Sequence, residues 1–157
     1  MRVLSVRSST LKFALVLVLS LAAISTMMIL VPSAESSAAS AKISYSDVST
    51  NADRLSFISQ FGWEVDDDPV EQVSVSVPED FDASYKRYNE IQLSQGLDLS
   101  KYRGKEVVKY TYNITNYKDS DGAVYINLLV YKNKIVGGDI SSADGNGFVY
   151  GFSGEKI

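Results

Sequence analysis

Carboxylate clusters and hydroxyl groups are the side chains of this sequence whose types and spacing could do chemistry. The 157 residues include no histidine and no cysteine, so imidazole catalysis, thiolate nucleophiles, disulfides and thiolate zinc sites are excluded. The run Asp66, Asp67 and Asp68 could offer oxygens to calcium. Consecutive side chains fan outward, however, and the alternating spacing of a calcium loop is absent, which favours a solvated acidic turn.

A second acidic group combines Asp139 with the loop residues Asp144, Gly145, Asn146 and Gly147. It is closer to a calcium-binding set, but it lacks the D-x-D-x-D-G pattern and the bidentate glutamate of a calcium loop. The sequence DGNG is also what a tight turn requires. We therefore predict a turn here, and we predict no metal site and no cofactor.

One hydroxyl and amine pair, Ser153 and Lys156, matches the S-x-x-K pattern of penicillin-recognising enzymes. Those enzymes place the pair on a helix and need two further motifs, whereas this pair lies in a glycine-flanked C-terminal segment. Two carboxylates across a cleft could hydrolyse a glycoside, but the spacing of the nineteen acidic residues favours no particular pair. We predict no catalytic residue and a non-catalytic protein.

A glycine pair is the first candidate for ligand binding. The backbone amides of Gly137 and Gly138, next to Asp139, could cradle a ligand. A β-bulge or a close backbone approach also explains two glycines inside a strand.

Tyrosines are the second candidate, because their rings combine an apolar body with a polar tip. Tyr125 and Tyr131, together with Tyr102, are predicted on the sheet face that points away from the second helix, where they would bind a ligand. We favour the alternative, in which these rings belong to the core because the first helix covers this face, with Trp63 as its plug.

Two helices are predicted to position these residues. The first starts at Thr50, with Asp53 as its capping-box partner, and ends at Gly62. The second starts near Asp80 and ends before Gly96. An aromatic stripe on the second helix should lie on the sheet, and its members are Phe81, Tyr85, Tyr88 and Ile91.

Five segments alternate apolar and polar residues as strands do, and they cover residues 71–77, 108–114, 123–131, 135–140 and 148–152. Lys132 and Asn133 form a two-residue hairpin turn between the third and fourth strands. Short links and the lack of βαβ alternation predict an α+β fold. We expect an antiparallel sheet of about four to five strands, with the helices segregated to one face and a curved, cystatin-like geometry.

The N-terminus is predicted to insert into a membrane. Residues 13–31 form an uncharged apolar run after the cations of the segment 1–12, which fits a transmembrane signal anchor with the C-terminal domain outside. Residues 32–47 are a flexible tether, and residues 48–157 form one extracytoplasmic domain. A cleaved signal peptide, and hence a secreted protein, is the alternative.

The exported part is acidic. From Pro32 onward it carries 12 basic and 19 acidic residues, so its net charge is 12 − 19 = −7. Because such a surface is repelled by phosphate backbones, we predict no nucleic-acid partner.

Three segments carry a resemblance to a known family: RLSFISQFGWEV at 54–65, the run at 77–112 that ends YRGKEVVKYTY, and LLVYKNKIVGGDISS at 128–142. Together they resemble the DUF4830 family of small, single-span exported proteins of Firmicutes. The resemblance implies a Gram-positive source and membrane attachment. It implies no activity and no catalytic residues.

These observations predict a membrane-tethered, extracytoplasmic binding domain whose partner is an envelope protein, a peptide or a wall component. One alternative is a small carboxylate-based hydrolase acting on cell-wall material. The other is a cystatin-like inhibitory or regulatory module, whose wedge would be the hairpin at Lys132 and Asn133.

Overall fold

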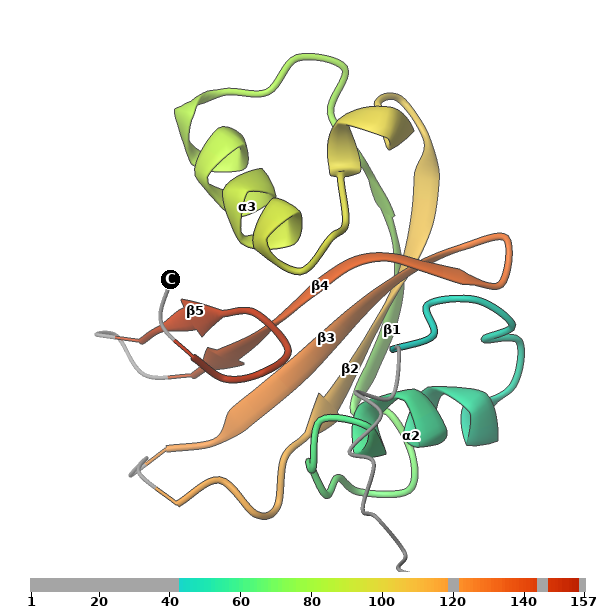
Figure 1. Cartoon of the computed structure of the whole chain (residues 1–157), viewed down its shortest axis with the longest axis vertical. Helices are drawn as coiled ribbons and strands as arrows, with labels where there is room; N and C mark the ends of the chain where they lie inside the picture. Colours follow the sequence, from blue (N-terminus) through green and yellow to red (C-terminus); the bar gives the residue numbers. More distant parts are fainter. Residues whose placement is uncertain (1–42, 119–121, 144–146, 156–157) are drawn as a thin grey trace, which may run out of the picture. The chain divides into compact units, whose positions relative to one another are not determined.

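The computed structural model describes residues 43–118, 122–143 and 147–155. The predicted membrane segment 13–31 and most of the predicted tether lie outside the described residues. Within the described ranges, no helix has both the length and the apolar character needed to cross a membrane. The elements, drawn in Figure 1, are α2 (Asn51–Ser59), β1 (Glu71–Ser76), α3 (Ala83–Ser94), the 3-10 helix η1 (Leu99–Tyr102), β2 (Glu106–Asn113), β3 (Val124–Tyr131), β4 (Lys134–Ser142) and β5 (Val149–Tyr150).

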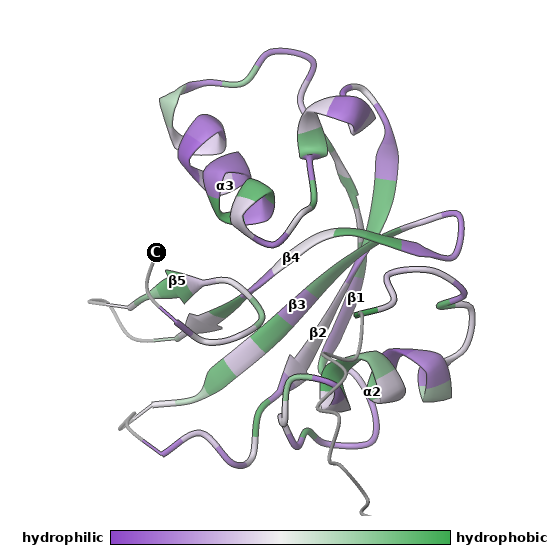
Figure 2. Ribbon diagram, viewed as in Figure 1, coloured by the Kyte–Doolittle hydropathy of each residue, from purple (hydrophilic) through white to green (hydrophobic). Residues whose placement is uncertain are grey.

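The five strands form one antiparallel sheet in the order β1-β2-β3-β4-β5. This confirms the predicted α+β class and the meander of short links. The central strand β3 alternates as expected, because Val124, Ile126 and Leu128 are all buried. Figure 2 shows that β3 is largely hydrophobic, whereas α3 is largely hydrophilic.

Helix α2 begins as its sequence predicts. The Thr50 side chain accepts a hydrogen bond from the Asp53 backbone N–H, and the Asp53 carboxylate accepts from the Thr50 N–H at 2.7 Å, which completes a capping box. The backbone N–H of Thr50 heads the hydrogen bonds that lower the pKa of Asp53 to about 2. The helix is anchored to β2 by Arg54, whose Nε donates to the Tyr112 hydroxyl at 2.8 Å.

The two helices lie on opposite faces of the sheet, so the prediction that they are segregated to one face is wrong. Phe57 and Ile58 of α2 pack in the same core cluster as Ile126 of β3. Tyr85 and Tyr88 of α3 pack in a second cluster with alternate residues of β3, including Leu129. The physical reason is that β3 is apolar on both faces, as a central strand must be when both of its faces are covered.

Helix α3 starts at Ala83, three residues after the predicted start near Asp80. Its N-cap is Asp82, whose Oδ1 accepts from the Tyr85 backbone N–H at 2.7 Å. Its most buried residues are polar, Asn89 and Gln92, whereas the apolar Leu93 is 54% exposed. The predicted aromatic stripe does pack on the sheet in part. The buried centre of the helix, however, is attached by hydrogen bonds rather than by apolar contact.

The β3–β4 hairpin has the predicted two-residue turn, and both residues have positive φ, 47° at Lys132 and 61° at Asn133. The pairing register shifts between Leu129 and Val130, which places the extra residue of a β-bulge at Val136. The bulge therefore lies directly before Gly137 and Gly138, the two glycines from which it was predicted. Gly138 has the second predicted feature, a close approach, because a Cβ at this position would overlap the Asn127 carbonyl oxygen.

We predict that Gly138→Ala lowers the free energy of unfolding by about 3 kcal/mol, because a backbone carbonyl and a packed ring cannot both move away. Gly137→Ala is the matched control. Its Cβ would meet the ends of side chains at 3.0–3.3 Å, and these can shift, so we expect a loss of about 1 kcal/mol. Urea unfolding, monitored by the fluorescence of Trp63, measures the loss of unfolding free energy in both variants. Equal losses would contradict the steric argument.

Candidate functional site

A row of polar side chains crosses the α3 face of the sheet. Glu71, Thr111, Asn127 and Asp139 lie opposite one another on β1, β2, β3 and β4. The Thr111 hydroxyl lies 2.8 Å from Asn127 Oδ1, and Asn127 Nδ2 donates to Asp139 Oδ1 at 2.9 Å. The row therefore links the strands through side chains as well as through the backbone.

Asp139 is the buried end of this row. Its second carboxylate oxygen, Oδ2, accepts from the Tyr88 hydroxyl of α3 at 2.7 Å. Burial raises the pKa of the Asp139 carboxyl, whereas the hydrogen bonds from Tyr88 and Asn127 act in the opposite direction. Burial likewise raises the pKa of Tyr88 well above its ordinary value, and the nearby Asp139 charge adds to this effect. Both carboxylate oxygens are thus held by neighbouring side chains.

Next to Asp139, two glutamines of α3 and its C-cap hold Gly138 on β4. The Gly138 N–H donates to Gln92 Oε1 at 2.8 Å, and Gln95 Nε2 donates to the Gly138 carbonyl oxygen at 3.1 Å. Gln95 Oε1 also accepts from the Phe152 N–H at 2.6 Å. The backbone of the predicted ligand cradle is therefore hydrogen-bonded within the protein. We call Gln92, Gln95 and Gly138 the glutamine clamp.

The two candidate tyrosines have different surroundings. Tyr131 packs at the edge of the α3 cluster and meets the Tyr102 ring at a centroid distance of 5.6 Å. Tyr125 is half-buried on the same face and lies opposite Asn113 and Ser141. This face carries α3, so the prediction that it points away from the second helix is wrong.

Trp63 does not plug the tyrosine face either. Its indole Nε1 donates to the Phe152 carbonyl oxygen at 2.7 Å, and its ring stacks on Tyr117 at 5.7 Å. These contacts belong to the core cluster on the α2 side of the sheet. The five predicted binding residues are thus divided between a buried polar network and two separate tyrosine environments, and their binding role stays a prediction.

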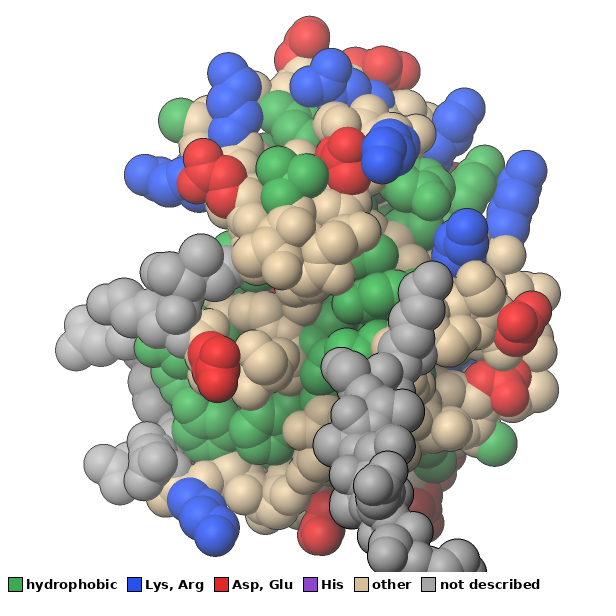
Figure 3. Space-filling view, in the orientation of Figure 1, with side chains coloured by type: hydrophobic (Ala, Val, Ile, Leu, Met, Phe, Trp, Pro, Cys, Tyr) green, Lys and Arg blue, Asp and Glu red, His purple; other side chains and the backbone are tan. Residues whose placement is uncertain are grey.

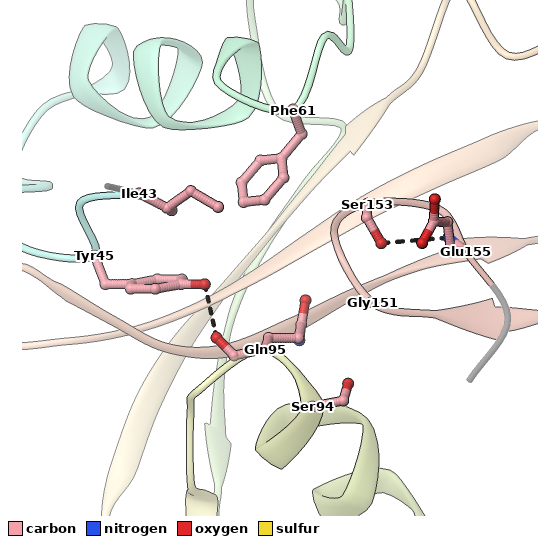
Figure 4. Close-up of a pocket in the computed structure, with 8 residues that line it drawn as sticks. All are labelled: Ile43, Tyr45, Phe61, Ser94, Gln95, Gly151, Ser153 and Glu155. Atoms are coloured by element: carbon pink, nitrogen blue, oxygen red, sulfur yellow. Dashed lines mark hydrogen bonds between the residues drawn. The ribbon is translucent and has the colours of Figure 1, made fainter. Parts of the chain in front are cut away.

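A concave pocket lies elsewhere, where the segment before α2, the end of α3 and the C-terminal loop meet. Its volume is about 440 Å³, within the range of small-molecule sites. Figure 4 shows the rings of Tyr45 and Phe61 on one side, facing Gln95 and Ser94, with Ser153 and Glu155 on the other. Figure 3 shows hydrophobic side chains gathered in the hollow below α3. We call the pocket lined by these residues the Tyr45 pocket.

The walls of the Tyr45 pocket define the chemistry it can accept. Tyr45 donates its hydroxyl to the Gln95 carbonyl oxygen at 2.9 Å, which fixes the ring against the end of α3. Rings and an aliphatic residue, Ile43, form the apolar wall, and Glu155 is the single acid among the described lining residues. Such a site suits an apolar group that carries a hydrogen-bond donor.

The other candidates are three groups of residues, two of which are only partly described. Asp66, Asp67 and Asp68 are exposed, as a solvated turn requires. Residues 144–146 of the second acidic group and Lys156 of the S-x-x-K pair lie outside the described residues. Among the described side chains, no group of three or more acids could hold a metal ion.

Sequence reasoning missed Asn89 and the two glutamines of the clamp. The available signal was their spacing, because residues 89, 92 and 95 repeat every three positions and so share one side of α3. Asn89 Oδ1 accepts from the Leu99 N–H at 2.8 Å, which extends the same polar side to η1. Polar residues at helical spacing ordinarily indicate a solvated face, and only packing reveals that this one is buried.

Comparison with known proteins finds one family. A domain of unknown function, DUF4830, matches residues 57–140, which include α3, the glutamine clamp and Asp139. Neither the curated proteins nor the solved structures contain a match to the chain.

We predict that Asp139→Asn changes how stability depends on pH. Because the folded-state pKa of Asp139 is raised, the folded state binds a proton more readily, and stability falls as pH rises through that pKa. The amide keeps one acceptor for Asn127 and donates to the Tyr88 oxygen. The variant should therefore gain stability relative to the unsubstituted chain as pH rises above the ordinary pKa of an aspartate, about 4, in urea unfolding. A pH-independent difference would contradict this.

Proposed function

The chain belongs to the DUF4830 family, whose description assigns no activity, and from its geometry we propose that it is a non-catalytic binding domain held outside the cell membrane. The apolar run at 13–31, preceded only by cations, supports the membrane anchor and its orientation. The acidic body and the lack of imidazole and thiol groups support binding rather than catalysis.

The Tyr45 pocket is the observation that carries the proposal. It combines an apolar wall with a few polar groups, the usual composition of a ligand site. The acidic Glu155 and the net charge of −7 after the predicted anchor favour a neutral or cationic ligand group. An amine- or hydroxyl-bearing part of an envelope protein, a peptide or a wall component has this chemistry.

A carboxylate-based hydrolase is the less favoured alternative. Such an enzyme needs two carboxyl groups on either side of the scissile bond, and the described lining of the Tyr45 pocket contains one, Glu155. Asp139 has both oxygens engaged by Tyr88 and Asn127. A carboxylate in that position serves the fold rather than a reaction.

A cystatin-like inhibitory module is the other alternative. The helix α3 between β1 and β2 on one face of a five-stranded meander is consistent with a cystatin-like geometry. The exposed hairpin tip at Lys132 would be the wedge, but the neighbouring Asn133 carbonyl already accepts from the Val48 N–H at 2.9 Å. We therefore favour binding at the Tyr45 pocket.

The proposed location predicts that protease added to intact cells digests the domain, because an exported body faces the medium or the wall. A cytoplasmic marker protein in the same cells should survive and is the control. Immunoblotting before and after lysis measures both. Survival of the domain until lysis would contradict the proposed location.

The proposed binding site predicts that Ser94→Trp, which fills the Tyr45 pocket from the end of α3, weakens partner retention about tenfold. Ser94 is exposed, so the substitution should leave the core intact. Glu90→Trp adds the same ring one turn earlier on the exposed side of α3 and should bind normally. The measurement is retention of envelope components by the immobilised full-length chain. Equal retention by the two variants would exclude the pocket.

A further inference from the structure

The backbone groups along β4 are covered by other parts of the chain, whereas those along the outer side of β1 are not covered by any described residue. Along β4, the Ile135 N–H donates to the Tyr45 carbonyl oxygen at 2.8 Å, and the glutamine clamp engages both backbone groups of Gly138. Further along the same edge, β5 pairs with Ile140 and Ser141. Three separate parts of the chain therefore cover the β4 edge. This is how proteins commonly prevent a sheet edge from pairing with another chain.

Along β1, the backbone groups of alternate residues point away from the sheet. The Val77 N–H donates to the Lys105 carbonyl oxygen of the strand beside it, and β1 pairs with β2 in register. Because antiparallel strands direct alternate residues to opposite sides, Ser74 and its neighbours two residues away direct their N–H and C=O groups outward. The described sheet has no strand beyond β1. Gln72, Ser74 and Ser76 thus form an open edge.

Within β1, side chains give the edge little protection, because Glu71 at its start is the single charged residue of the strand. The strand has six residues and contains no proline and no lysine. Five of the six are exposed, and Val73 is 39% exposed beside Val70 at 57%. Exposed valines next to unpaired backbone groups are the features of a surface that binds an added strand.

The charge around this edge indicates what kind of strand it accepts. Residues 55–85, which include β1 and both of its flanks, contain eight acidic residues and no lysine or arginine. All eight are exposed, and they are Glu64, Asp66, Asp67, Asp68, Glu71, Glu79, Asp80 and Asp82. Only Glu71 has an ion-pair partner among the described residues, Lys109 of β2. Arg103, Lys105 and Lys109 contact or pair with this stretch from β2 or from the residues just before it, so they lie on the side of β1 away from the open edge. A positively charged segment complements the outer side of β1.

We propose that the edge of β1 binds an extended, lysine- or arginine-rich peptide segment of a partner protein by strand addition. The backbone groups of Gln72, Ser74 and Ser76 supply the ladder hydrogen bonds, and the acidic flanks select the charge. This goes beyond the proposed function, because the β1 edge and the Tyr45 pocket share no residue.

A second copy of this chain fits the edge less well. Antiparallel pairing of two β1 strands would bring the acidic residues before one strand close to those after the other. Asp66, Asp67 and Asp68 would then approach Glu79 and Asp80 of the second copy, and like charges at that range repel. The charge of the edge therefore favours a cationic partner.

The test uses the full-length chain in detergent solution and a fluorescent peptide of about nine residues that alternates lysine and valine. Fluorescence anisotropy measures its Kd. Ser74→Pro removes one outward N–H without touching the hydrogen bonds to β2, and it should weaken binding about tenfold. Ser74→Thr keeps the N–H and should change the Kd by less than about twofold. Circular dichroism checks that both variants fold.

Further peptides separate strand addition from charge attraction alone. A version with glutamate in place of lysine should not bind. A fully N-methylated version keeps every charge but has no backbone N–H, so it should bind about tenfold more weakly even if Ser74→Pro fails to fold. Equal binding of the N-methylated peptide, or of a folded Ser74→Pro variant, would overturn the proposal. Self-association of the chain that Ser74→Pro abolishes, measured by ultracentrifugation, would overturn it in favour of a second copy.

Discussion

The attachment of α3 to Gly138 is the interaction on which the rest of the domain depends. Two glutamine side chains satisfy the N–H and C=O of one residue of β4, and one of them also binds the Phe152 backbone. No side chain fits at Gly138, because the Asn127 carbonyl and the Phe152 ring occupy its space. The clamp therefore holds helix α3, strand β4 and the C-terminal loop in a single arrangement.

Buried polar groups of this kind stabilise only when every partner is present. In the described part of the chain no buried side-chain nitrogen or oxygen lacks a hydrogen-bond partner. The Asp139 carboxylate, the most deeply buried acid of the network, is held by Tyr88 and Asn127. Its burial raises its pKa, yet its oxygens are committed to the fold. The raised pKa of Asp139 therefore follows from its burial and is not evidence of a catalytic role.

The same clamp explains why the domain has one covered edge and one open edge. Gln92 and Gln95 use their polar groups on β4, while the segment at Tyr45 bonds Ile135 and β5 pairs with Ile140 and Ser141 of the same strand. No comparable contact reaches β1 from the described residues, and its backbone faces solvent beside an acidic surface. The two proposed binding surfaces of this domain are thus the Tyr45 pocket and the open edge of β1.

The local sequence pattern determined where helices, strands and turns form, whereas contacts between distant residues determined how these elements pack against one another. The capping box at Thr50, the turn at Lys132 and Asn133 and the alternation of β3 were all predictable, because each depends on neighbours within a few residues. The face that each helix covers, the burial of Gln92 and the pocket beside Tyr45 were not predictable. These features join residues more than forty positions apart, such as Gln92 and Gly138, and periodicity carries no information about such pairs.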